Sequence, residues 1–157
     1  MAKYRMVRDR LSRTGLFQFQ CADPASADVI SLAHDPSYVH AFLNGTLPSS
    51  VMRRIGFPWS EPLVLRTTSS VGGTLGATAD ALHTGWGGNL AGGTHHAFHA
   101  GGSGYCVFND IAVAVHKLRA DGLANRAAII DLDVHQGSRH RTTLRARPRC
   151  VDALLAR

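Results

Sequence analysis

The 157-residue sequence has few cysteines, few aromatic residues and no long apolar run. No stretch approaches the ~20 consecutive apolar residues that a membrane-spanning helix needs. The charged N-terminal segment MAKYRMVRDRLSR lacks the apolar region of a secretory signal. The three cysteines are odd in number and widely spaced, which excludes a disulfide framework and favours a reducing, cytoplasmic setting. They are Cys21, Cys106 and Cys150.

What the sequence does contain is typical of one folded domain. Hydrophobic residues make up 45% of the chain and charged residues 18%, which excludes a disordered protein. A chain of this length can bury a hydrophobic core. Neither an internal repeat nor an oligomeric state is indicated by the pattern.

The net charge of +6 comes almost entirely from one end of the chain. Residues 1–137 contain 11 Lys and Arg against 10 Asp and Glu, a net charge of +1. Residues 138–157 contain six arginines against Asp152, a net charge of +5. Such a basic block can bind nucleic acid through phosphate contacts, but the more common interpretation is a solvated end, which we favour. We therefore predict a boundary at 137/138, followed by an Arg-rich tail.

The first half of the chain alternates turn signals with short helical patterns. Residues 3–13 predict an amphipathic helix with Tyr4, Val7 and Leu11 on one face. Asp35-Pro36 predicts a helix start. The prolines around Leu63-Val64-Leu65 predict a loop with a short extended piece.

The second half reads as an α/β unit. Residues 69–85 predict a helix whose glycines allow close packing against a sheet, and residues 89–93 suggest a short strand. Residues 109–122 predict a helix ended by Asp121-Gly122, with a buried stripe of Ile111, Val115 and Leu118. The run RAAIIDLDVH, residues 126–135, predicts a buried parallel strand that is acidic at its carboxyl end, where α/β proteins place their sites. Helices alternating with strands predict an α/β fold.

The segment DLDVH, residues 131–135, carries the sharpest chemical signal. On an extended strand Asp131, Asp133 and His135 share one face. Two carboxylates and an imidazole there need a cation to neutralise them, and Asp133 with His135 supplies the oxygen and nitrogen donors that zinc accepts. The alternative is that an aspartate caps a loop and His135 lies on the surface. We favour a metal or catalytic site.

The adjacent histidines His95 and His96 lie in a glycine-rich segment, residues 92–110. Taken alone they are equally compatible with an exposed polar loop. Beside a carboxylate-bearing strand end they suggest acid–base chemistry, because a carboxylate fixes the tautomer of an imidazole and raises its basicity. Cys106 could be a nucleophile, but nothing beside it clearly lowers its pKa, so we interpret it as a packing residue. His99 is interpreted as a loop residue, and no role is assigned to His34, His40, His83 and His116.

The segments GGTHHAFHAGGSGYCVFND and IIDLDVHQG, in this order, resemble the histone deacetylase superfamily of zinc-dependent acyl-lysine hydrolases. The form DLDVHQG is most similar to the class IV-like, largely bacterial branch. The resemblance covers about residues 2–137. It implies an arginase-like α/β fold, a parallel central sheet flanked by helices on both faces, here as an incomplete domain.

Carried over by position, the resemblance assigns roles to seven residues. It implies that Asp133 and His135 bind Zn²⁺, that His95 and His96 are the catalytic pair with His96 the general base, and that Asp131 holds His95. Gly104 and Tyr105 would line the channel for the substrate. That substrate would be an acetylated lysine protein or a small acetylated amine, and backbone near Asp131 would bind K⁺.

The family's third zinc ligand and catalytic tyrosine come from segments that would lie beyond residue 157. We therefore expect a partial deacetylase-like domain over 1–137, an incomplete zinc site, and an out-of-frame or truncated ending over 138–157. Ser138 stands where the family places a residue that supports His96. Three alternatives stay open: a non-enzymatic remnant of a deacetylase domain, an arginase-type metallohydrolase, and a tail that binds nucleic acid.

Overall fold

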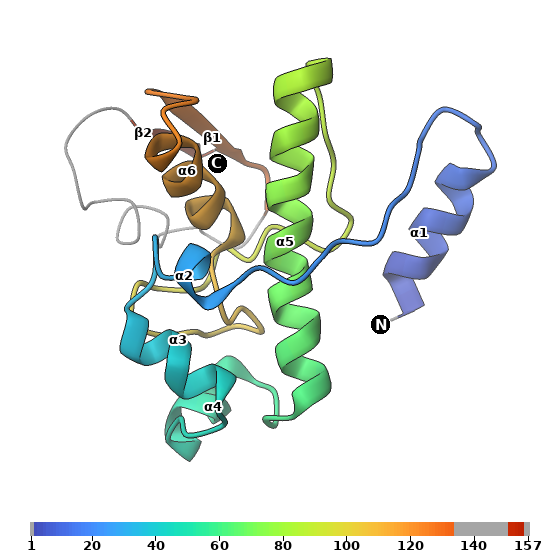
Figure 1. Cartoon of the computed structure of the whole chain (residues 1–157). Helices are drawn as coiled ribbons and strands as arrows, with labels where there is room; N and C mark the ends of the chain where they lie inside the picture. Colours follow the sequence, from blue (N-terminus) through green and yellow to red (C-terminus); the bar gives the residue numbers. More distant parts are fainter. Residues whose placement is uncertain (1, 134–150, 156–157) are drawn as a thin grey trace.

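The computed structural model describes residues 2–133 and, as backbone, residues 151–155. Figure 1 shows a long central helix with shorter helices and a two-stranded sheet beside it. Within the described ranges no helix is both long and apolar enough to cross a membrane. The elements, in chain order, are α1 (Ala2–Ser12), α2 (Ala27–Ile30), α3 (Pro36–Leu43), α4 (Ser49–Ile55), α5 (Glu61–Thr84), α6 (Asp110–Ala120), β1 (Ala127–Asp131) and β2 (Val151–Leu155).

Helix α1 forms where the sequence predicts it, but its apolar face is not buried. None of its residues is buried, and Met6 and Val7 are 67% and 45% exposed. In Figure 1 the helix stands apart from the remaining helices. The amphipathic pattern therefore predicts the helix correctly and gives no information about what its apolar face contacts.

Two helix starts follow from local chemistry. The Asp35 carboxylate accepts hydrogen bonds from the backbone amides of Ser37 and Tyr38 at 2.8 and 3.1 Å, which confirms the start predicted at Asp35-Pro36. The extended piece predicted at residues 63–65 is wrong, because this segment is the first turn of α5. Ser60 caps that turn, and Pro62 is tolerated because the first helical residues need no N–H partner.

The sequence predicts that the glycines of α5 allow close packing against a sheet. In the structure they allow the close approach of loops. A Cβ atom at Gly72 would lie 1.8 Å from the carbonyl oxygen of Asp23. The chain crosses the helix there, and the Ala25 amide donates to the Thr68 carbonyl. The other close neighbour of the helix is α6.

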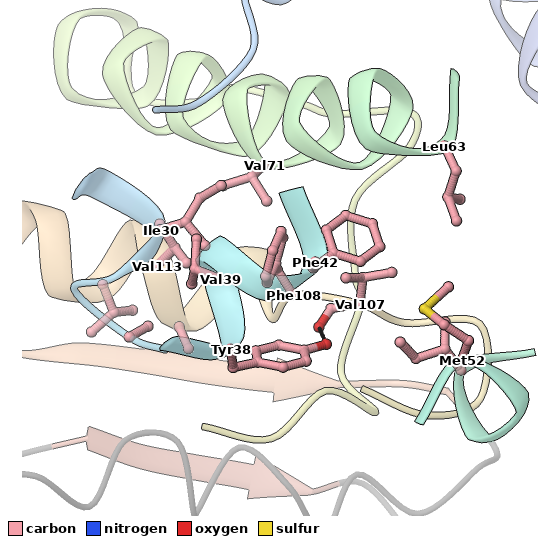
Figure 2. Packing of buried hydrophobic residues seen from close by; sticks show 14 of the residues in the cluster. Ile30, Tyr38, Val39, Phe42, Met52, Leu63, Val71, Val107, Phe108 and Val113 are labelled. Carbon is pink, nitrogen blue, oxygen red and sulfur yellow. Dashed lines mark hydrogen bonds between the residues drawn. The ribbon is translucent and has the colours of Figure 1, made fainter. Parts of the chain in front are cut away.

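The hydrophobic core lies between α2, α3, α5 and α6. Phe108 is at its centre and makes edge-on contacts with Tyr38 and Phe42 at ring-centroid distances of 5.8 and 5.3 Å. Figure 2 shows these rings beneath Val71 of α5, with Val113 of α6 nearby. The Tyr38 hydroxyl donates to the Val107 carbonyl at 2.9 Å. In α6 the predicted stripe is partly right: Val115 is buried, and Ile111 only partly so.

Strand β1 pairs in parallel with β2, with Ala127 opposite Val151 and Asp131 opposite Leu155. The predicted parallel strand is thus confirmed, although only one of its faces is covered. Ile129 is 6% exposed, while Ile130 and Leu132 are 66% and 81% exposed. The short strand suggested at residues 89–93 is wrong, because the chain forms a turn there.

Candidate active site

Residues 92–109 connect a turn after α5 to the start of α6, and we call them the histidine loop. The segment has no regular strand and is folded by isolated antiparallel bridges between Phe98 and Gly101 and between Ser103 and Cys106. Its residues vary from buried to half-buried, with a few exposed positions. A loop with this degree of burial needs partners for its backbone groups, and several of those partners are side chains.

Asp131, His95 and His96 form a continuous hydrogen-bonded chain. His95 Nδ1 lies 2.8 Å from Asp131 Oδ2, and His95 Nε2 lies 3.0 Å from His96 Nε2. The side chains of His95 and Asp131 are 9% and 11% exposed. An ionised carboxylate accepts only, so the proton between these two groups is carried by Nδ1. In neutral His95, Nε2 is then an acceptor, and His96 Nε2–H is the donor that faces it. The structure thus brings the adjacent pair His95 and His96 together with Asp131, which lies 36 positions after His95 in the sequence.

The two predicted zinc ligands are placed less completely. Asp133 lies two residues beyond the end of β1 and is exposed, and its amide donates to Asp131 Oδ1 at 3.0 Å. Asp131 therefore supports the turn after the strand as well as His95, so the loop-capping interpretation applies to it, and its catalytic role stays a prediction. His135 lies outside the described residues. Among residues 2–133 no group of three His, Cys, Asp or Glu side chains is arranged to hold a metal ion.

Gly104 and Tyr105 form a turn that is attached to α4. Both residues have positive φ, 56° and 64°, which is uncommon for a tyrosine. Their amides donate to the carbonyls of Arg54 and Ile55 at 3.3 and 2.7 Å. The Tyr105 ring is 65% exposed and contacts the Phe57 ring edge-on at a centroid distance of 5.1 Å. An exposed ring on the histidine loop is compatible with the channel wall that the resemblance implies.

Two histidines without an assigned role, His34 and His99, connect the histidine loop to the core. His34 is fully buried, accepts the Asn109 amide at Nε2, and directs Nδ1 to the His99 carbonyl at 3.1 Å. His99 Nδ1 in turn bonds to the Ala33 carbonyl at 2.9 Å. Burial lowers the pKa of His34 from 6.5 to about 4, against the raising effect of its backbone hydrogen bonds. His34 is therefore neutral near pH 7 and acts as a connector between two segments.

Asp110 is the residue that sequence reasoning missed most clearly. It is fully buried, lies in the first turn of α6 and bonds to Gly93 and Thr94, immediately before His95. The available signal was an acidic residue following a helix-capping asparagine, Asn109. That signal accounts for the helix start alone, so it gave no reason to expect a contact with the histidine loop.

A sequence model of the Histone deacetylase domain matches residues 1–151. The chain therefore belongs to the histone deacetylase family, which confirms the resemblance found in the sequence. The match extends past residue 137, and the division at 137/138 stays a prediction.

Three similar proteins illustrate the relationship. An uncharacterized protein of Picosynechococcus sp. is 46% identical over 140 residues, which cover 87% of this chain and 47% of that protein. Histone deacetylase 2 of Arabidopsis thaliana is 33% identical over 78% of this chain and 34% of its own length. Acetoin utilization protein AcuC of Bacillus subtilis is 34% identical over 72% of this chain and 32% of its own. The chain thus spans less than half the length of these relatives.

Solved structures give the same assignment. The crystal structure of a histone deacetylase homolog from Aquifex aeolicus is similar with a TM-score of 0.72 and 26% identity, over 85% of this chain and 38% of that chain. A structure of a histone deacetylase homolog complexed with SAHA matches equally well. The fold is therefore the deacetylase-like α/β fold that the sequence predicts.

Proposed function

We propose that this chain carries the histidine-bearing part of a zinc-dependent deacylase site, which removes acetyl or other acyl groups from lysine or amine substrates. The observation that supports this most is the hydrogen-bonded series Asp131–His95–His96. A buried carboxylate behind one imidazole, and a second imidazole in front, is an arrangement suited to moving a proton at one point. Family membership supports the same class of reaction.

In this proposal the two histidines divide the proton transfers between them. Asp131 keeps the proton of His95 on Nδ1 and so leaves Nε2 directed at the reacting centre. For His96 to take a proton from the attacking water, its neutral ring must carry its hydrogen on Nδ1, so that Nε2 accepts from the water in place of donating to His95. A histidine of the pair then returns a proton to the leaving amine. The Nε2 atoms of both rings already lie 3.0 Å apart, so a water bound at this point is within reach of either.

Asp133 and His135 are the residues that we propose to bind zinc, since carboxylate and imidazole are ligands that zinc accepts. The described residues provide only the carboxylate. Bound zinc supplies a Lewis acid that polarises the amide carbonyl. Catalytic zinc sites use three protein ligands, so the proposal requires a third ligand besides these two. K⁺ near the backbone of Asp131, and Gly104 with Tyr105 as channel wall, belong to the same proposal.

The test is hydrolysis of an acetyl-lysine peptide by the full chain, with the zinc content measured on the same sample. We expect His96→Ala to lower turnover at least about 100-fold, the usual contribution of a general acid or base. His83→Ala is the matched control, because His83 is exposed in the last turn of α5. Stoichiometric zinc without turnover would contradict the proposal and favour the non-enzymatic remnant. Turnover that survives His96→Ala would contradict it too and would point to another general base.

A further inference from the structure

We propose that Asp110 is a positioning residue for the histidine pair, an inference that rests on the proposed function. Asp110 touches neither His95 nor His96 in any contact described above. Its carboxylate instead holds the two residues that precede them, which sets where the chain delivers the imidazoles. The argument depends on the number, direction and burial of its contacts.

The Asp110 carboxylate accepts hydrogen bonds on both oxygens. Oδ1 accepts from the Thr94 amide at 2.8 Å, and Oδ2 accepts from the Gly93 amide at 3.0 Å and the Thr74 hydroxyl at 2.5 Å. The Thr94 hydroxyl lies a further 2.6 Å from Oδ1 and 2.5 Å from the Phe108 carbonyl, so its single hydrogen is shared between two acceptors. The two amides and the Thr74 hydroxyl are donors, the arrangement that an ionised carboxylate requires. The negative charge also lies at the N-terminal end of α6, where the helix dipole stabilises it.

These contacts join the two ends of the histidine loop. Thr94 lies near the start of the loop, and its hydroxyl is 2.5 Å from the Phe108 carbonyl near the end. The Asp110 amide donates back to that hydroxyl at 3.2 Å. Because the ends are held together by buried polar contacts, the path of residues 95–107 starts and finishes at fixed points. The His95 side chain is thereby directed toward Asp131.

A second polar layer fixes Asp110 against α5. The Asn89 side chain donates to the Thr74 hydroxyl at 2.9 Å, and the nearest acceptor for that hydroxyl is Asp110 at 2.5 Å, against 3.5 Å for the Ser70 carbonyl. There is no space for a side chain beside this cluster: a Cβ atom at Gly92 would lie 2.6 Å from Asp110 Oδ2. The glycine at position 92 is therefore explained by the approach of the backbone to this carboxylate.

The experiment compares Asp110→Asn, Thr94→Val and Thr94→Ser in the full chain, with Thr78→Val as control. Thr78 is a partly buried threonine of α5 whose hydroxyl bonds only to the Thr74 carbonyl among the contacts described. The first readout is the NMR signal of the His95 Nδ1 proton, which reports the bond to Asp131. The second is the separation of kcat from KM with an acetyl-lysine peptide.

We expect Asp110→Asn and Thr94→Val to shift or broaden the Nδ1 proton signal and to lower kcat about 10- to 100-fold with KM unchanged, as for a misplaced catalytic group. Thr94→Ser, which keeps the hydroxyl, and Thr78→Val should resemble the wild type. Folded Asp110→Asn and Thr94→Val proteins with wild-type signals would overturn the proposal. If Asp110→Asn does not fold, the two Thr94 variants decide. If the wild type shows no turnover, the proposed function fails, and the proton signal still decides the role of Asp110.

Discussion

The histidine loop and the end of β1 meet at the contact between His95 and Asp131, but they are held in place in different ways. The loop is attached to α3, α4, α5 and α6 by buried side chains such as Tyr38 and Asp110, and by His34 just before α3. The strand end has Ile129 in the core but exposes Ile130 and Leu132. Both regions carry predicted site residues, and only the loop is enclosed by described neighbours.

This difference shows which part of the site is preorganised within the described chain. Asp131, Asp110, His34 and the end of α4, all outside the loop, bond to groups of the loop, so the positions of the imidazoles are determined by several independent contacts. At the strand end the Asp133 amide bonds to Asp131 Oδ1, and the side chains of Ile130 and Leu132 are exposed. We therefore expect substitutions in the loop to change stability much more than substitutions at the strand end.

The largest contrast is expected between Phe108→Ala and Leu132→Ala. Phe108 is 1% exposed at the centre of the aromatic cluster, whereas Leu132 is 81% exposed. Truncating a buried phenylalanine costs about 3–5 kcal/mol in the free energy of unfolding, while an exposed substitution changes it by about 0.5 kcal/mol or less. Urea unfolding followed by circular dichroism measures both. Equal losses for the two variants would show that β1 is as well covered as the loop.

The second contrast concerns pH. The pKa of His34 is about 4 in the folded chain and 6.5 when unfolded, so between these values the unfolded state binds the extra proton. The free energy of unfolding therefore decreases as the pH falls from 6.5 to 4, by about 3 kcal/mol in total, and then levels off. Urea unfolding across this range should show the loss.

The pH experiment is repeated with His34→Gln, which removes the titrating group, and with His83→Gln as the control. His34→Gln should be less stable at pH 7 and should lose this part of the pH dependence. His83 is exposed, so its replacement should leave the wild-type profile. An unchanged slope in His34→Gln would mean that another group is responsible.

The smallest effect on stability, with the largest on solubility, is expected at the strand. Ile130 and Leu132 are two apolar side chains exposed next to each other on one face of the strand end. Exposed apolar surface beside a strand promotes association. Ile130→Lys combined with Leu132→Lys should raise the soluble yield and lower the light scattering without changing the urea midpoint. Val7→Lys in α1, 45% exposed, is the matched control for added charge away from the strand.

The sequence predicted most of what depends on local chemistry. Caps and periodicity located the helix starts at Asp35 and Asn109. They also located the strand, although the predicted range of 126–135 is longer than the observed Ala127–Asp131. The grouping of His95, His96 and Asp131 was also expected, because the resemblance to the histone deacetylases implies that Asp131 holds His95. The error at residues 63–65 arose because a proline in the first turn of a helix resembles a loop signal.

What could not be predicted depends on contacts between distant positions. His34 bonds to an amide 75 residues away, and nothing near it in the sequence marks it as buried. Asp110 reaches the loop across 16 or 17 residues from a position that the helix cap already explained. The exposure of α1 and of Ile130 follows from which neighbours are present, which amphipathic periodicity does not specify.

The attachment of Tyr105 to α4 has a consequence for how this part of the molecule responds to change. The last carbonyls of a helix have no partner within it, and in α4 two of them, at Arg54 and Ile55, receive the amides of Gly104 and Tyr105. The helix terminus and the turn therefore satisfy each other's backbone groups, although the bonded residues lie 50 positions apart in the sequence. A displacement of α4 would carry the exposed ring of Tyr105 with it, so the helix sets the direction of the ring from outside the loop that contains it.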